Sequence, residues 1–380
     1  MSPRRADEEH RAATPLELFF DLCFVVAVAL AAGELHHALS EGHLAHALPW
    51  YLLMFFGVWW AWMNFTWFAS AYDTDDGPYR LTTLVQIAGA LVFAAGIKPA
   101  FEGGDLRVVV LGYVIMRLAM GTQWLRVARS DPERRACALR YAGGIAAAQV
   151  LWILRLWTPE SWTAITIGAL IIAELAVPVW AERAASTTWH PQHITERYGL
   201  FTIIVLGESI LAASTAVQSA VSIGKGDLGL VSLAAAGLAT VFAMWWLYFD
   251  QPVHHLLRSL PRAIFWGYGH YVIFAAAAAV GAGLQVAVDH KTGHSALGGV
   301  ATGYAIAAPV AIYLLGLWAL HVWPNAASRG RAVVVGYPVA AALVLLTPFS
   351  PAPIHLAALV LTALVAASAI TTHPRQPANA

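Results

Sequence analysis

Charged residues are scarce in this chain of 380 residues, because Asp, Glu, Lys and Arg together make up only 12% of it. Soluble globular domains carry about 25% charged residues. Apolar residues reach 59%, and the mean hydropathy is +0.63. This composition excludes an ordinary soluble domain. The 22 basic and 22 acidic residues balance, so no excess of positive charge points to a nucleic-acid partner.

Cysteines and enzyme motifs are scarce as well. Cys23 and Cys137 lie far apart and form no Cys-x-x-Cys pair, which predicts two free thiols. The sequence contains no P-loop, GxGxxG turn, HExxH helix or GxSxG elbow, so an enzyme is not favoured and no cofactor is predicted. A polar tail, 1–14, leads directly into an apolar run without the cleavage site of a removable signal peptide.

Long apolar runs are what the chain does contain. A helix needs about 20 apolar residues to cross a hydrocarbon core of about 30 Å. Such segments lie at 15–39, 48–70, 81–101, 106–126, 138–156, 161–181, 199–219, 229–249, 264–286, 298–320, 332–348 and 353–371. They lack the alternation of β-barrel strands, so the pattern predicts an all-α polytopic transmembrane helix bundle of about 12 spans. Prolines such as Pro338 and Pro351 interrupt the last two segments, which could instead form a re-entrant or kinked pair.

The placement of Lys and Arg predicts the orientation in the bilayer. With the N-terminus in the cytosol, the inner loops and tails hold Arg4, Arg5, Arg11, Arg80, Arg126, Arg129, Arg134, Arg135, Arg140, Arg183, Arg197, Arg258, Arg262, Arg329, Arg331 and Arg375. The outer loops hold only Lys98, Arg107, Arg155, Lys225 and Lys291. This bias predicts a multi-pass protein of the plasma membrane with both termini cytosolic.

Short echoes between the two halves suggest an internal repeat. The run at 59–62 (WWAW) resembles that at 245–248 (WWLY), and Leu18-Phe19 resembles Leu200-Phe201. Six spans per half would make the repeats parallel, although chance matching is the alternative. The expected organisation is an N-terminal tail at 1–14, a first six-helix repeat at 15–181, a cytosolic linker at 182–198, a second repeat at 199–371 and a C-terminal tail at 372–380.

Ionisable residues inside spans are costly and usually face a partner or a wet cavity. Those within the predicted spans are Glu17, Asp21, Glu34, Arg117, Glu174, Glu208 and His270. At a rise of about 1.5 Å per residue, Asp21, Arg117, Glu174 and Glu208 fall at similar depths in the inner half. We expect them to form a binding site, with Arg117 neutralising Asp21 or Glu208. The remaining acids would then handle protons or cations, unless the group is only a structural ion pair.

Four further positions are candidates around this site. Glu17 lies one turn before Asp21 and could simply be solvated, and Asn64 belongs to the Trp-rich run 59–67. Glu196 and Arg197 are predicted to anchor a helix at the membrane interface, where Gly199 and Gly207 would allow close helix packing.

Two other patterns could bind cations, but neither predicts a metal site. His190, His193 and Glu196 are spaced by three, yet Pro191 weakens the helix that would align them. The acidic loop 73–76, closed by Gly77-Pro78 and Arg80, does not match a calcium-binding loop. We interpret Asp73 and Arg80 as part of a solvated loop with Asp–Arg contacts.

Four motifs carry a family resemblance over nearly the whole chain. They are TPLELFFDL at 14–22, WWAWMNFTW at 59–67, DTDDGPYR at 73–80 and HITERYGLFTIIVLGES at 193–209. The chain resembles the bacterial low temperature requirement protein A family, a group of multi-span membrane proteins. The resemblance supplies no substrate and no catalytic residues. It marks Glu17, Asp21, Glu196, Arg197 and Glu208 as motif positions.

These observations favour a transporter of a small solute or cation, possibly coupled to protons. A cation channel built from two six-span repeats is one alternative, and a membrane-bound enzyme or sensor is another. The expected partners are the lipid bilayer and the small solute or cation, with no nucleic acid, and the oligomeric state is left open.

Overall fold

The computed structural model describes residues 1–380 except 2, 5–10, 223–227, 328 and 373–380. Its regular structure is helical, and no strand occurs among the described residues. The helices are α1 (Pro15–Ser40), α2 (Leu44–Tyr72), α3 (Gly77–Ala95), α4 (Ile97–Gly103), α5 (Arg107–Ser130), α6 (Arg135–Arg155), α7 (Thr163–Glu182), α8 (Pro191–Ser222), α9 (Leu228–Phe249), α10 (Leu260–Thr292), α11 (Gly299–Leu317), α12 (Arg331–Leu346) and α13 (Pro353–Thr372).

Twelve helical segments of the described chain are long and apolar enough to cross a membrane. They correspond one to one to the twelve predicted runs, so the all-α fold and the number of candidate spans are confirmed. The last two runs form separate helices, α12 and α13, and each is long enough to span a bilayer. Cys23 and Cys137 are both free thiols, as predicted.

Contact clustering divides the chain into two compact units. The first unit comprises 1–31 and 53–198, and the second comprises 32–52 and 199–380. Because 32–52 belongs to the second unit, the two units are not the same as the two halves of the sequence. That the two halves are repeats remains a prediction.

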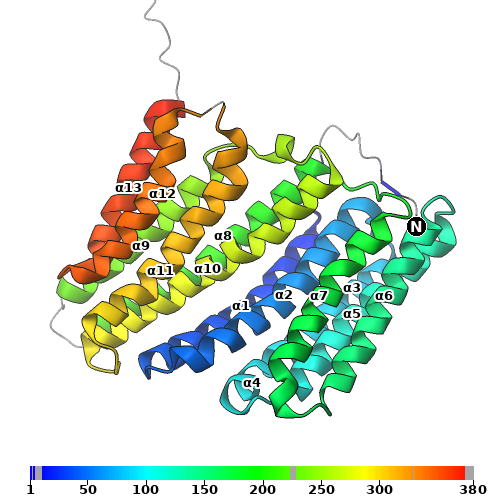
Figure 1. Ribbon diagram of the computed structural model, residues 1–380, viewed down its shortest axis with the longest axis horizontal. Helices are drawn as coiled ribbons and strands as arrows, with labels where there is room; N and C mark the ends of the chain where they lie inside the picture. Colours follow the sequence, from blue (N-terminus) through cyan, green and yellow to red (C-terminus); the bar gives the residue numbers. More distant parts are fainter. Residues whose placement is uncertain (2, 5–10, 223–227, 328, 373–380) are drawn as a thin grey trace, which may run out of the picture. The chain divides into compact units, whose positions relative to one another are not determined.

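In the first unit, α3 packs on α5, α5 on α6 and α6 on α7 (Figure 1). Glycine makes the closest of these approaches possible. A Cβ atom on Gly112 of α5 would lie 2.2 Å from the backbone nitrogen of Phe93 on α3. Only a residue without a side chain allows two helix backbones to come this close.

In the second unit, α10 packs on α11, α11 on α12, α12 on α13, and α13 on α9 (Figure 1). Here too a glycine sits at the tightest contact, because a Cβ on Gly283 of α10 would lie 2.2 Å from the carbonyl oxygen of Ala305 on α11. Pro309 lies four residues after Ala305 and has no N–H to donate to that carbonyl.

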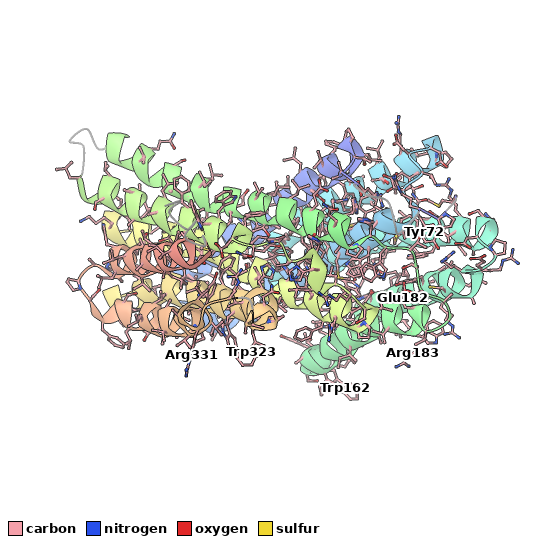
Figure 2. All side chains as sticks on the ribbon, turned by 90° about the horizontal axis from the view of Figure 1, so that it is seen from above. Tyr72, Trp162, Glu182, Arg183, Trp323 and Arg331 are labelled. Carbon is pink, nitrogen blue, oxygen red and sulfur yellow. The ribbon has the colours of Figure 1, made fainter. Side chains whose placement is uncertain are left out.

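Tryptophans mark the ends of several spans. Trp162 and Trp323 are 60% and 59% exposed, and Figure 2 shows both at the periphery of the ribbon. Amphipathic indole rings prefer the boundary between headgroups and hydrocarbon. These positions agree with the aromatic belt of a membrane protein.

Candidate functional site

A cluster of charged residues is buried in the first unit, between α1 and α8. Glu17 and Asp21 are one turn apart on α1, and His193 and Arg197 are one turn apart on α8, so each pair shares a helix face. All four residues are 0% exposed. We call these four residues the Arg197 cluster.

The guanidinium of Arg197 holds both carboxylates. Its Nη1 lies 2.7 Å from Glu17 Oε1. Its Nε donates to Asp21 Oδ2 at 3.1 Å, and its Nη2 donates to Asp21 Oδ1. On the other side, His193 Nε2 lies 3.1 Å from Glu17 Oε1. The planar fork of arginine suits such paired contacts, which a lysine could not reproduce.

Aromatic side chains surround the cluster and exclude water from it. Trp62 of α2 donates its indole N–H to Asp21 Oδ1 at 2.7 Å, and the ring of Phe65 lies 5.8 Å from the Arg197 guanidinium. The hydroxyl of Tyr79 is buried and has no hydrogen-bond partner among the residues that the structure describes. Electrostatic interactions are stronger in such a dry site than at a surface.

The charges of the Arg197 cluster do not balance by themselves. Two carboxylates face one guanidinium, and the remaining group, His193, is an imidazole. Taken alone, these four residues are neutral only with one additional proton, on His193 or on a carboxyl group, although the guanidinium of Arg11 also acts on Glu17. A net charge in a dry interior is costly, so this proton has a large effect on the energy of the packing.

A second buried ion pair in the first unit is balanced. Arg117 of α5 donates to Glu174 Oε2 of α7 at 2.8 Å, and both side chains are at most 1% exposed. Trp60 of α2 donates to the same oxygen at 3.0 Å, and Gln149 of α6 donates to Oε1 at 3.0 Å. The carboxylate of Glu174 therefore connects four helices, and the guanidinium of Arg117 balances its charge.

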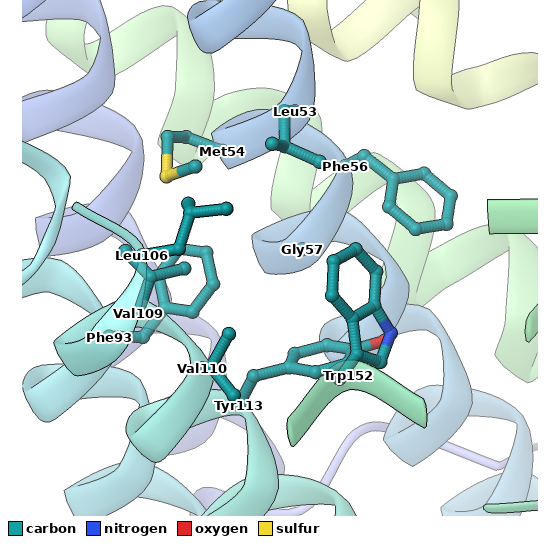
Figure 3. Close-up of a pocket in the computed structure, with 10 residues that line it drawn as sticks. All are labelled: Leu53, Met54, Phe56, Gly57, Phe93, Leu106, Val109, Val110, Tyr113 and Trp152. Carbon is teal, nitrogen blue, oxygen red and sulfur yellow. The ribbon is translucent and has the colours of Figure 1, made fainter. Parts of the chain in front are cut away.

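A small cavity lies beside this pair (Figure 3). Its volume is about 20 Å³, and ten mostly apolar residues line it, including Tyr113 and Trp152. The rings of those two residues meet edge to face, with centroids 5.9 Å apart, and Tyr113 also lies 5.9 Å from the Arg117 guanidinium. Space for about one water molecule with apolar walls does not make a solute site.

The expected pairing of Arg117 with Asp21 or Glu208 is wrong, because Arg117 binds Glu174 and Asp21 binds Arg197. Glu208 is half-buried on the part of α8 that belongs to the second unit, and it has no ion pair among the described residues. Asn64 is buried but donates to the carbonyl of Trp60 on its own helix at 2.8 Å. The excess acid is therefore found in the Arg197 cluster.

Two expectations about Glu17 and Arg197 are wrong. Glu17 is fully buried rather than solvated, and Arg197 is a buried ion-pair partner rather than an anchor at the membrane interface. The reason is where α8 begins. The apolar run was predicted to begin at 199, but the helix begins at Pro191, where proline in the first turn loses no helical hydrogen bond. A helix that begins at 191 places His193 and Arg197 on one face. Their spacing of four residues was therefore the signal in the sequence for this buried pair.

Two other polar residues of the segment 190–197 form hydrogen bonds with the backbone. His190 accepts from the backbone N–H of His193 at 3.3 Å, and Glu196 accepts from that of Ala13 at 3.3 Å. No group of three metal-ligating side chains occurs in the described part of the chain. A Cβ on Gly199 would lie 3.0 Å from Phe249, which agrees with close packing, whereas nothing lies within 4 Å of Gly207.

The acidic loop makes the predicted Asp–Arg contacts. Asp75 binds Arg80 at 2.6 Å on the surface, and Asp76 binds Arg126 of α5 at 2.6 Å. Hydrogen bonds from Arg80 lower the pKa of Asp75. Burial alone would raise the pKa of Asp76, but the N–H of the residue three positions on and the guanidinium of Arg126 outweigh it, so the pKa of Asp76 is lowered.

Asp73 is the exception in this loop, because it is buried rather than solvated. It lies 3.8 Å from Arg11 of the N-terminal tail. Arg11 also donates to the backbone carbonyls of Ala69 and Ser70 at the end of α2. Burial raises the pKa of Asp73. The guanidinium of Arg11 thus connects this part of the N-terminal segment to the end of α2.

The second unit contains a buried polar cluster of a different kind. His270 of α10 contacts the carbonyl of Trp266 through Nδ1 at 2.8 Å and the hydroxyl of Tyr248 of α9 through Nε2 at 3.1 Å. His321 lies in a short π-helix that follows α11, with its ring 5.3 Å from that of His270. Sequence reasoning found His270 but missed His321, because the tenth span was predicted to end at 320.

Comparisons with known proteins agree with this architecture. The family described as bacterial low temperature requirement A protein (LtrA) matches residues 12–370, which is nearly the whole chain. A protein of Rhizobium meliloti (strain 1021), described as uncharacterized, is 28% identical over 257 residues. The match covers 65% of this chain and 61% of that protein, so the chain spans less than two thirds of its relative's length.

Proposed function

The chain belongs to the bacterial low temperature requirement A family of membrane proteins, and we propose that it is a proton-coupled transporter of a small solute or cation. The observation that carries the proposal is the Arg197 cluster, with two buried carboxylates against one guanidinium. A multi-pass protein of a bacterial membrane gains nothing in stability from an uncompensated buried acid. Such groups mark ion and proton pathways in membrane proteins.

The proton requirement supplies the coupling. When the cluster carries its additional proton, it is neutral and the closed packing of α1 against α8 is favoured. When the proton leaves, one negative charge remains in a dry interior, and the cost of desolvation favours an arrangement that admits water or a cation. A group that is stable in two arrangements at different protonation states is what proton-coupled exchange requires.

Asp21 and Glu17 have different roles in this proposal. Asp21 takes two hydrogen bonds from Arg197 and one from Trp62, so it is the fixed counter-ion. Glu17 contacts Arg197 and His193, so in this proposal Glu17 and His193 are the groups that take up and release the proton. The orphan hydroxyl of Tyr79 offers a further polar contact in the same cluster.

Flux measurements test the proposal. The full chain is reconstituted in proteoliposomes with a pH-sensitive dye inside, and solutes and cations are screened for saturable, solute-dependent proton movement. Glu17→Gln is expected to abolish the proton movement, since the cluster then balances without a proton. Asp75→Asn, which removes an exposed carboxylate of the acidic loop, is the matched control and should transport like the wild type.

Three outcomes contradict the proposal. The first is a current that is proportional to voltage and does not saturate, which is the behaviour of a channel. The second is the absence of solute-dependent flux over a broad panel. The third is proton coupling that survives in Glu17→Gln. A spectroscopic measurement keeps the proton itself testable. The infrared band of a protonated carboxyl group or the nitrogen signals of a protonated His193 should be present in the wild type, and the signal should change in Glu17→Gln.

A further inference from the structure

An apolar groove of about 600 Å³ opens in the second unit. Its walls come from the end of α1, the start of α2, and the middle parts of α10 and α11. Representative lining residues are Leu39, Leu48, Ala276, Ala308 and Ile312. Sites for small ligands have volumes of about 300–1,000 Å³, so this groove is large enough to hold a ligand.

The groove offers almost no polar contact to a ligand. Two of its lining tyrosines direct their hydroxyls into the protein. Tyr51 donates to the carbonyl of Ala275 at 2.6 Å, and Tyr271 donates to that of Leu52 at 2.8 Å. Both hydroxyls are therefore occupied, and leucine, alanine, valine and isoleucine make most of the remaining wall. A polar solute would lose its hydration here without replacement.

The length of the groove matches half of a bilayer. Along α2 the lining runs from Leu44 to Leu52, and along α11 from Ala301 to Ile312. At a rise of about 1.5 Å per residue these stretches measure about 12 Å and about 16 Å. The hydrocarbon core is about 30 Å thick, so the lined stretches are about as long as one leaflet is thick.

Beyond the lining, near the ends of α1 and α10, lies a group of polar residues that we call the polar rim; one of them, Ser40, directly follows the lining residue Leu39. Asp289 Oδ2 contacts His36 Nε2 at 2.7 Å and Ser40 Oγ at 2.8 Å. The exposed residues His290 and Lys291 follow directly on α10. The cationic side chain of Lys291 and the carboxylate of Asp289 thus lie near each other on α10. This combination suits a headgroup that carries both a phosphate and an amine.

We propose that the groove binds one phospholipid of a single leaflet, with an acyl chain along the leucine wall and a zwitterionic headgroup at the polar rim. Three features support this occupant. The groove belongs to segments that are long and apolar enough to cross a membrane, its length is close to the thickness of one leaflet, and the polar rim beyond its lining contains a carboxylate and a lysine. A lipid held in this way stabilises α1, α2, α10 and α11 together.

Photo-crosslinking of the full chain tests the site. The probe is phosphatidylethanolamine with a photoactivatable group on one acyl chain, incorporated in the bilayer that holds the protein. The expected crosslinks concentrate on peptides containing 44–52 and 301–312, and unlabelled phosphatidylethanolamine in excess reduces them at least fivefold. Crosslinks spread evenly over all lipid-facing helices would indicate boundary lipid only and would overturn the proposal.

A groove-filling variant provides the matched comparison. Ala308 faces the groove, so Ala308→Phe is expected to reduce the crosslinks at 44–52 several-fold. Ala363 is exposed on α13, outside the groove, and Ala363→Phe should leave them unchanged. Circular dichroism and gel filtration check that both variants fold. Equal crosslinking in both variants, or crosslinks between two copies of the chain at the groove, would show that a lipid is not the occupant.

Discussion

The two units pack their helices in a similar order, but they bury different kinds of polar residues. In the first unit, two arginines and three carboxylates lie inside the helix bundle and are joined by indole and amide donors. In the second unit, the buried polar group between helices is the neutral set of Tyr248, His270 and His321. The described buried ion pair of that unit, Asp250 with Arg329, lies outside the helices.

This difference distinguishes the residues that pack the helices together from the residues that carry buried charge. Consecutive helices pack on one another in both units, and both units contain glycines where two backbones nearly touch, closest at Gly112 and Gly283. Apolar packing and small residues are sufficient for such a bundle. Buried charges are not needed for it and cost desolvation energy. We therefore expect changes in the first unit to affect proton handling and changes in the second unit to affect packing or lipid contact.

Removing the central cation of the first unit should have the largest effect. Arg197→Gln leaves Glu17 and Asp21 buried without a counter-charge, and we expect a loss of about 3–5 kcal/mol in the free energy of unfolding. Thermal unfolding in detergent measures it. Arg80→Gln removes an arginine from an exposed pair and should cost about 0–1 kcal/mol. Similar losses in both variants would mean that burial does not distinguish the two pairs.

The glycine contacts test what the two units share. Gly112→Ala and Gly283→Ala each place a methyl group 2.2 Å from a backbone atom, so both should lose about 2–3 kcal/mol through overpacking. Gly143 has nothing within 4 Å, and Gly143→Ala should be neutral or slightly stabilising. Thermal unfolding of the three variants provides the comparison. A large loss in only one unit would show that the two bundles depend on different contacts.

Single hydrogen bonds should differ in value between the units. Trp62→Phe removes a donor to the buried carboxylate of Asp21, and we expect a loss of about 2 kcal/mol. Tyr248→Phe removes a neutral partner of His270 and should cost about 1 kcal/mol. Both changes are measured by the shift of the unfolding midpoint. Equal shifts would contradict the view that charge is the distinguishing feature of the first unit.

The smallest expected effect lies at the start of α3. Asp76 accepts the N–H of Tyr79 at 2.8 Å as an N-cap, and Asp76→Ala should cost about 1 kcal/mol. Because the pKa of Asp76 is lowered in the folded protein, this stability is present above the ordinary carboxyl pKa of about 3.9 and is lost as the pH falls through the folded value. The difference between wild type and variant should therefore shrink as the pH falls below the ordinary carboxyl pKa of about 3.9. A difference that persists there would indicate a cause other than the charged cap.

Hydropathy was sufficient to predict the fold, and the site was only partly predictable. A run of about 20 apolar residues has few alternatives to a spanning helix, so all twelve candidate spans agree with the expectation. Depth along a helix predicted that Asp21, Arg117 and Glu174 are buried, but depth does not give the direction in which a side chain points. The rotation of α5 and α7 decides that Arg117 binds Glu174, and that rotation depends on packing between helices.

Helix ends were the other source of error. A search for apolar runs excludes charged residues by construction, so it set the start of the seventh span at 199 and treated Arg197 as part of a linker. The helix extends two turns further, to Pro191, because the buried partners Glu17 and Asp21 make the charged turn favourable. A buried ion pair thus lengthens a span in a way that no single segment of sequence reveals.

The two indoles that reach the carboxylates lie two residues apart on α2, and this spacing has a mechanical consequence. Residues two apart on an α-helix point in directions about 200° apart, so Trp60 and Trp62 extend from nearly opposite sides of α2 toward Glu174 and Asp21. If α2 turned about its own axis, both hydrogen bonds would break together. The two hydrogen bonds therefore restrain α2 against rotation about its own axis. Replacing one of the two indoles would remove one of these restraints and leave the other in place.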